Sequence, residues 1–176
     1  MKINHTVKRI LTAMVLLPSL LFFLVFNEYT FYILLICVSF LSFYEWNNLN
    51  KKKNFSFFFG IFIFVISIIS IVFLRGNTRE DLEILIFVFS ICIMCDIGGY
   101  VIGNIFKGPK LTSLSPNKTI SGALGSIIFS FFPILITYIF KILPPLINLN
   151  LKILFFIFLL SIVCQLGDLT VSLVKR

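Results

Sequence analysis

The chain has 176 residues, of which 59% are hydrophobic and only 12% are charged, and its formal net charge is +8. Apolar runs recur with so few interruptions that this composition excludes a soluble globular domain and indicates a polytopic membrane protein. The excess of Lys and Arg does not indicate nucleic-acid binding, because these residues fall mostly between apolar runs, where membrane orientation and anionic headgroups explain them.

Six apolar segments predict six membrane-spanning helices, and the third, residues 55–74, is long enough to cross a hydrocarbon core of about 30 Å. The expected spans are residues 10–26, 29–46, 55–74, 82–106, 120–140 and 151–174. The predicted fold is therefore an all-α transmembrane helix bundle that forms one domain over residues 1–176. Within it, residues 1–81 are expected to be apolar scaffold, and residues 82–176 carry the polar motifs.

The distribution of basic residues predicts the orientation of these spans. Six spans place the loops alternately on two sides of the membrane, and 11 of the 15 Lys and Arg residues fall on one side. These are Lys2, Lys8, Arg9, Lys51, Lys52, Lys53, Lys107, Lys110, Lys118, Lys175 and Arg176. By the positive-inside rule, both termini and the loop at residues 107–119 are expected to be cytoplasmic.

All four cysteines lie inside apolar segments. Cys92 and Cys95 have the spacing of a redox motif, but they lack the soluble βαβ setting in which that motif usually acts. Cys37 and Cys164 stand alone. We therefore interpret the cysteines as small apolar helix residues.

Two carboxylates interrupt the apolar spans. An intramembrane carboxylate costs about 2.5 to 3.5 kcal/mol, so Asp96 and Asp168 each require an aqueous cavity, a partner or a cation. Asp96 shares a helix face with Gly99, Tyr100 and Gly103. The glycines allow either close helix packing or access of a substrate to the backbone.

A second polar stripe occurs in the last span. Gln165, Asp168, Ser172 and Lys175 fall on one face of an otherwise apolar helix. Such a stripe is expected to line a pocket, and the alternative is a hydrogen-bonded seam between helices.

The loop before the fifth span contains a pattern typical of a helix start. In Ser115-Pro116-Asn117-Lys118-Thr119, Ser115 is the expected N-cap, Pro116 the first helical residue, and Lys118 part of the first turn. Free N–H groups and the helix dipole at that end, with nearby lysines, predict a phosphate site.

Together, these motifs resemble the phosphatidate cytidylyltransferase family. The resemblance is carried by Asp96-x-Gly98-x-Tyr100-x-x-Gly103-x-x-Phe106, Pro109-Lys110-Leu111, Ser115-Pro116-Asn117-Lys118-Thr119, Gly122 and Gly167-Asp168-Leu169-x-x-Ser172-x-x-Lys175-Arg176. It implies that phosphatidate attacks the α-phosphorus of CTP, giving CDP-diacylglycerol and pyrophosphate. The family's signature continues beyond the position of Arg176, so the resemblance also implies a C-terminally truncated member with little or no activity by itself.

The resemblance implies roles for individual residues. Asp96, Lys118 and Asp168 are the expected catalytic residues, and Asp168 and Asp96 are the expected ligands of Mg²⁺. The expected substrate-binding residues are Lys110, Ser115, Asn117, Thr119, Ser172, Lys175 and Arg176. The expected partners are CTP, phosphatidate, membrane lipids and a second copy of the chain, with no nucleic acid. The expected location is the bacterial inner membrane, with the active face toward the cytoplasm.

Two other functions fit the same residues. Intramembrane carboxylates and spans interrupted by Gly or Pro also occur in transporter and channel subunits. A non-catalytic assembly partner is the third hypothesis. The basic loop on one side favours the lipid-metabolism enzyme.

Overall fold

The computed structural model describes residues 5–49, 55–112, 115–140 and 150–174. Most of these residues are helical, which confirms the predicted all-α class. The chain divides into two compact units, Met1–Ile68 and Ile69–Arg176, and the boundary falls within one helix. Whether the chain acts as one domain stays a prediction.

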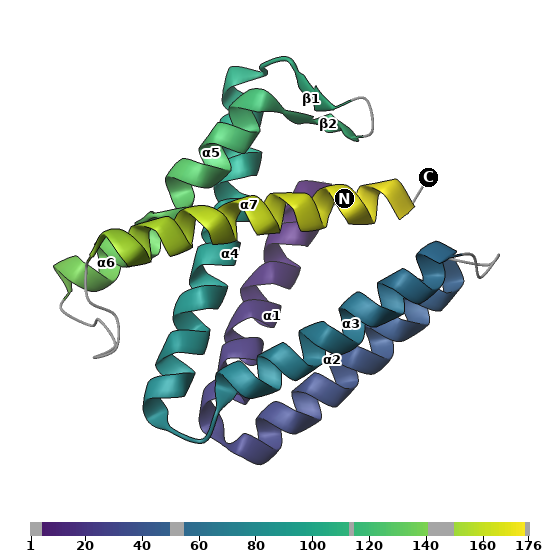
Figure 1. Cartoon of the computed structure of the whole chain (residues 1–176), viewed down its shortest axis with the longest axis vertical. Helices are drawn as coiled ribbons and strands as arrows, with labels where there is room; N and C mark the ends of the chain where they lie inside the picture. Colours follow the sequence, from purple (N-terminus) through teal and green to yellow (C-terminus); the bar gives the residue numbers. More distant parts are fainter. Residues whose placement is uncertain (1–4, 50–54, 113–114, 141–149, 175–176) are drawn as a thin grey trace. The chain divides into compact units, whose positions relative to one another are not determined.

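The first unit is built from apolar helices joined by short connections. Its helices are α1 (His5–Phe26), α2 (Glu28–Leu49) and the first part of α3 (Phe55–Arg75). Asn27 separates α1 from α2, and the Thr30 hydroxyl donates a hydrogen bond back to the Phe23 carbonyl (2.9 Å). Figure 1 shows α2 and α3 side by side, and the Trp46 Nε1–H donates to the Phe57 carbonyl at 3.3 Å between them.

The second unit contains the remaining helices. They are α4 (Arg79–Phe106), α5 (Ile120–Ser130), α6 (Phe132–Ile139) and α7 (Leu151–Val174). Thr78 is the N-cap of α4. Its hydroxyl accepts from the Asp81 N–H, and the Asp81 carboxylate accepts from the Thr78 N–H, both at 3.1 Å. In Figure 1, α5 lies along the last part of α4, and α7 crosses this pair. The apolar core of the unit is formed by Phe87, Ile91, Ile134 and Ile157.

A short antiparallel hairpin connects α4 to α5. Strand β1 (Lys110–Thr112) pairs with β2 (Ser115–Thr119), and the register aligns Lys110 with Thr119. The predicted helix start at Ser115 is therefore wrong, because the helix begins at Ile120 and its N-cap is Thr119. Pro116, which has no N–H to donate, is tolerated in β2 because a two-stranded ribbon leaves one edge of each strand unpaired.

The predicted fifth span is interrupted. α5 ends at Ser130, Phe131 forms the junction, and α6 starts at Phe132. Pro133 explains the break, since it lacks an N–H and its ring would clash with the carbonyl four residues earlier in a continuous helix. It is accommodated in the first turn of α6, where no helical N–H bond is required.

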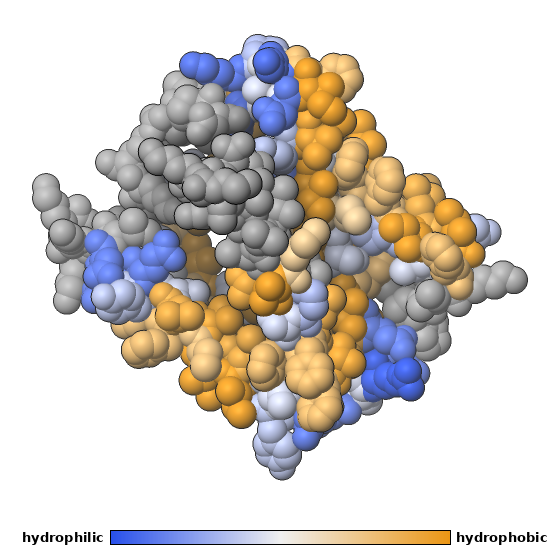
Figure 2. All heavy atoms as spheres, turned by 180° about the vertical axis from the view of Figure 1, so that it is seen from behind, coloured by the Kyte–Doolittle hydropathy of each residue, from blue (hydrophilic) through white to orange (hydrophobic). Residues whose placement is uncertain are grey.

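In the part of the chain that the structure describes, five helical segments are long and apolar enough to cross a membrane. These segments are Glu28–Asn48, Phe57–Arg75, Arg79–Phe106, Ile120–Ile139 and Leu151–Ser172, and Met14–Phe26 is a shorter apolar segment. Large apolar side chains are exposed along most of them, and they cover much of the surface in Figure 2. A surface of this kind requires lipid rather than water around it. The chain is therefore an integral membrane protein.

Candidate functional site

A polar cavity of about 630 Å³ lies in the second unit. Its walls come from α4, the hairpin, α5 and α7, so residues far apart in the sequence meet around it. The lining residues are Cys95, Asp96, Gly99, Tyr100, Gly103, Asn104, Leu111, Lys118, Thr119, Gly122, Ala123, Ser126, Gln165 and Asp168. This list includes all three predicted catalytic residues.

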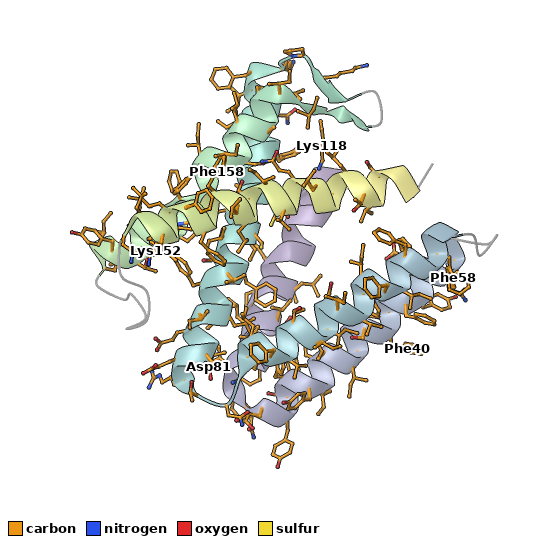
Figure 3. The ribbon with its side chains drawn as sticks, in the orientation of Figure 1. Phe40, Phe58, Asp81, Lys118, Lys152 and Phe158 are labelled. Carbon is orange, nitrogen blue, oxygen red and sulfur yellow. The ribbon has the colours of Figure 1, made fainter. Side chains whose placement is uncertain are left out.

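An ion pair joins the hairpin to α7 at this cavity. The Lys118 Nζ donates to the Asp168 Oδ2 at 2.8 Å, and Figure 3 shows Lys118 beside α7. The Lys118 side chain is 29% exposed and that of Asp168 is 56% exposed. An ion pair this open contributes only about 0 to 1 kcal/mol. A ligand with several negative charges can therefore displace Asp168 from Lys118 at small cost.

Asp96 faces the same charges from α4. It is close enough to both Asp168 and Lys118 to interact with them electrostatically. The site thus contains two carboxylates and one ammonium group in one cavity. The sequence placed Lys175 on the same helix face as Asp168. Among the described residues, Asp168 pairs with Lys118, which is 50 residues away in the sequence.

Glycines hold α4 and α5 close enough to form one wall of the cavity. A Cβ atom on Gly122 would lie 2.8 Å from the Gly99 carbonyl oxygen, and one on Gly98 would lie 2.5 Å from the Gly125 carbonyl oxygen. A Cβ on Gly103 would lie 3.1 Å from the Thr119 hydroxyl oxygen. Of the two interpretations of these glycines, the contacts support helix packing, since larger side chains would separate the two backbones.

The start of α5 offers fewer free donors than the sequence suggested. The Gly122 N–H donates to the Thr119 hydroxyl at 3.1 Å, and the Ile120 N–H donates to the Pro109 carbonyl at 2.9 Å. Two of the first amides are therefore already bonded within the protein. Lys118, which extends from the strand before the helix, places a positive charge at the cavity beside this end.

Gln165 confirms that one part of the polar stripe of α7 faces the protein interior. Its Nε2–H donates to the Ala123 carbonyl at 3.2 Å, which ties α7 to α5 beside the cavity. Ser172, farther along α7, instead donates to the Leu169 carbonyl of its own helix at 2.7 Å. Gln165 and Asp168 of the stripe thus line the cavity, and Ser172 is outside its lining.

The other predicted site residues do not line the cavity or are not fully described. Lys110 is exposed at the start of β1 and is outside the cavity lining. Ser115 and Asn117 have described backbone in β2 but no described side chains. Lys175 and Arg176 lie outside the described residues.

Sequence reasoning missed two polar residues of the cavity. Asn104 lies eight residues after Asp96, and it continues the same helix face. Ser126 is buried and lies seven residues after Thr119, again at helical spacing. Asn104 directly follows Gly103 and Ser126 lies four residues after Gly122, so both residues adjoin positions that the sequence motifs already include.

The carboxylates fit a magnesium ion that is shared with a substrate. Among the described residues, no group of three or more His, Cys, Asp or Glu side chains forms a metal site. Mg²⁺ usually binds one or two carboxylates and completes its shell with waters and substrate phosphates. Asp96 and Asp168 meet this requirement, and the donors do not suit a metal held by protein groups alone.

The fold defines an integral membrane protein, and one cavity of its second unit contains two carboxylates and one ammonium group. The model of the cytidylyltransferase family matches residues 48–176, and the chain belongs to this family. A phosphatidate cytidylyltransferase of Rickettsia conorii is 30% identical over 174 residues, which cover 96% of this chain and 74% of that protein. No solved structure matches the chain significantly.

Two further relatives cover the chain less completely. A phosphatidate cytidylyltransferase of Brucella suis is 35% identical over 123 residues, or 66% of this chain and 42% of that protein. A phosphatidate cytidylyltransferase of Staphylococcus saprophyticus is 34% identical over 132 residues, which cover 72% of this chain and 49% of that protein. The match thus reaches about three quarters of the Rickettsia protein and less than half of these two. All three proteins are named as the same transferase, which favours the enzyme over a transporter.

Proposed function

We propose that the cavity is the CTP site of a phosphatidate cytidylyltransferase. In this reaction the phosphate of phosphatidate attacks the α-phosphorus of CTP, giving CDP-diacylglycerol and pyrophosphate. The observation that carries the proposal is that Lys118, Asp168 and Asp96 surround one cavity. The names of the relatives supply the substrates, and the cavity supplies charges suited to them.

Lys118 is the proposed ligand of the CTP phosphates. The cavity volume of about 630 Å³ lies within the range of about 300 to 1,000 Å³ that is usual for small-molecule sites. A triphosphate that enters the cavity contacts the Lys118 ammonium group, which extends from strand β2. Because the pair with Asp168 is weak, the phosphate takes over Lys118 and releases the carboxylate.

Asp96 and Asp168 are the proposed ligands of Mg²⁺. When bound, Mg²⁺ neutralises charge on phosphate oxygens that builds up during transfer. The two carboxylates come from different helices, so they can hold the ion only while α4 and α7 keep their spacing. Thr119 and Gln165 support this arrangement, since one caps α5 and the other ties α7 to α5.

The lipid substrate is proposed to approach from the cytoplasmic leaflet of a bacterial inner membrane. The support for this orientation is that 11 of 15 basic residues belong to one set of loops. Ser172, Lys175 and Arg176, in the last turns of the sixth span and just after it, are proposed to bind the headgroup phosphate. Lys110→Cys in a cysteine-free chain tests the side, because a maleimide that cannot cross the membrane should not label it in intact cells. Labelling from outside would overturn the orientation.

CTP binding by the reconstituted chain tests the proposed site. Binding is the suitable measurement because it depends on the cavity itself. Lys118→Met should weaken CTP binding by about 1 to 3 kcal/mol, roughly 5- to 150-fold, since one charge-assisted contact is lost. The matched control is Lys152→Met, which removes an exposed lysine at the start of α7, outside the cavity lining, and should leave CTP affinity nearly unchanged. No saturable CTP binding, or equal losses in both variants, would overturn the proposal.

A further inference from the structure

Three thiols from two helices meet beside the cavity. The Sγ atoms of Cys92 in α4 and Cys164 in α7 are 3.4 Å apart, although 72 residues separate them in the sequence. Cys95 lines the cavity, and its Sγ lies 3.5 Å from the Ser161 hydroxyl oxygen. Ser161 belongs to α7, so Cys95 also contacts the helix that carries Cys164. The sequence suggested small apolar helix residues with no shared site, whereas the structure brings these thiols together.

The thiol pair lies next to the carboxylate pair on both helices. Cys92 precedes Asp96 by four residues, and Cys164 precedes Asp168 by four residues. Residues four apart lie one turn apart on the same helix face. A bond between the two sulfurs would therefore fix α4 to α7 one helical turn away from both carboxylates.

We propose that Cys92 and Cys164 form a reversible disulfide that links α4 to α7 and narrows the space between Asp96 and Asp168. The oxidant is a peroxide. One thiol attacks the O–O bond, forming a sulfenic acid and releasing water, and the second thiol displaces another water as the S–S bond forms. Two thiols and one hydrogen peroxide thus give one disulfide and two waters.

The geometry favours this pair over the Cys92–Cys95 pair. A disulfide has an S–S length of about 2.05 Å, so sulfurs that start 3.4 Å apart must approach by only about 1.4 Å. Cys92 and Cys95 belong to the middle of one continuous helix, and the Cys95 thiol is directed to Ser161. Cys95 lines the polar cavity, so peroxide that enters the cavity can reach the thiol cluster.

Mass spectrometry of the full chain in lipid nanodiscs tests the bond directly. The protein is treated with hydrogen peroxide, its remaining thiols are alkylated, and its disulfide-linked peptides are mapped. The expected product joins Cys92 to Cys164 within one chain and disappears on treatment with dithiothreitol. Cys37→Ser, a change at an exposed cysteine of the first unit, should leave the bond intact, and Cys92→Ser should abolish it. The proposal would be overturned if the chain without substitutions formed a Cys92–Cys95 bond, or if its Cys164 were fully alkylated after oxidation.

A second measurement tests the effect on the cavity, and this part rests on the proposed function. Because the sulfurs must approach, oxidation draws the carboxylates together and increases their repulsion. CTP affinity in the presence of Mg²⁺ should fall roughly fivefold or more, a typical size for coupling between two sites, and Cys92→Ser should not respond. A mapped disulfide with unchanged CTP affinity would overturn the coupling. A mapped disulfide in a chain whose reduced form binds no CTP would overturn the proposed function and leave the disulfide established.

Discussion

The two units pack their helices in different ways. In the second unit, α4 and α5 approach backbone to backbone, so that a Cβ on Gly125 would lie 2.7 Å from the Gly98 carbonyl oxygen. In the first unit, the ring of Trp46 from α2 occupies the space where a Cβ on Gly60 of α3 would lie. Backbone contacts cannot move without moving a helix, whereas a side chain can turn aside. The polar cavity therefore has a rigid wall, and the α2–α3 pair has an adjustable contact.

Apolar character does not tell these two modes of packing apart. α3 is almost wholly apolar, yet only Phe57 and Arg75 are buried among its described side chains. α4 carries Asp96 in its second half together with three glycines, and more of its residues are buried. In a membrane, apolar side chains pack against lipid as favourably as against another helix, so they do not identify a helix contact. Small and polar residues identify it instead.

Gly125→Val should have the largest effect on stability. Its added carbons meet the Gly98 carbonyl and Ile102, so α4 and α5 must separate. Overpacking of this kind costs about 1 to 3 kcal/mol or more. The change should lower the midpoint of thermal unfolding in detergent and weaken CTP binding, because the cavity wall moves.

Gly167→Val is the matched control for this change. A Cβ at Gly167 of α7 meets nothing within 4 Å, so the same substitution should leave the unfolding midpoint nearly unchanged. Equal destabilisation by both variants would show that backbone contact between α4 and α5 is not special. The different helix packing in the two units would then have no measurable effect on stability.

The spans themselves were predictable from the sequence. Residues 151–174 were expected as the sixth span and form α7 with the same limits, and α3 extends only one residue beyond its expected end. Both follow from segment length and from the cost of polar residues in lipid. The orientation of the spans stays a prediction.

The hairpin and the ion pair were not predictable in the same way. The pattern at Ser115 and Pro116 fits a helix start, but pairing with β1 decides the structure, and such pairing depends on residues outside the local pattern. The apolar run begins at Ile120, directly after Thr119, which is the signal that could have identified the true cap. The pairing of Lys118 with Asp168 depends on how α7 crosses the hairpin, which helical spacing cannot show.

Thr119→Ala tests whether Thr119 is the N-cap of α5. Its expected effect on stability is smaller than that of Gly125→Val. The Thr119 hydroxyl accepts the Gly122 N–H at the start of the rigid pair, so its loss should cost about 1 kcal/mol, within a range of about 0.5 to 2 kcal/mol. Ser115→Ala should change the free energy of unfolding much less, because Ser115 lies in β2 and does not cap α5. Unfolding in detergent compares the two variants. A larger loss for Ser115→Ala would restore the helix start that the sequence suggested.

Gly60→Ala should have the smallest effect. The new methyl group displaces the Trp46 ring and its hydrogen bond to Phe57, a loss of about 0.5 to 1.5 kcal/mol. Alanine gains about 1 kcal/mol over glycine in a helix, so the two effects nearly cancel. Fluorescence of Trp46, the single tryptophan of the chain, should change although the unfolding midpoint does not. An unchanged spectrum together with a large loss of stability would show that this contact is as rigid as the α4–α5 pair.

A double-mutant cycle on CTP binding tests whether Lys118 and Asp168 form one charged site for a nucleotide and its metal. CTP affinity is measured across a Mg²⁺ titration for the unmodified chain, Lys118→Met, Asp168→Asn and the double variant. We expect Asp168→Asn to raise the Mg²⁺ concentration needed for CTP binding and Lys118→Met to weaken binding at every Mg²⁺ concentration. The two effects should be non-additive by about 0.5 kcal/mol or more. Additive effects together with an unchanged Mg²⁺ dependence would contradict a single charged site.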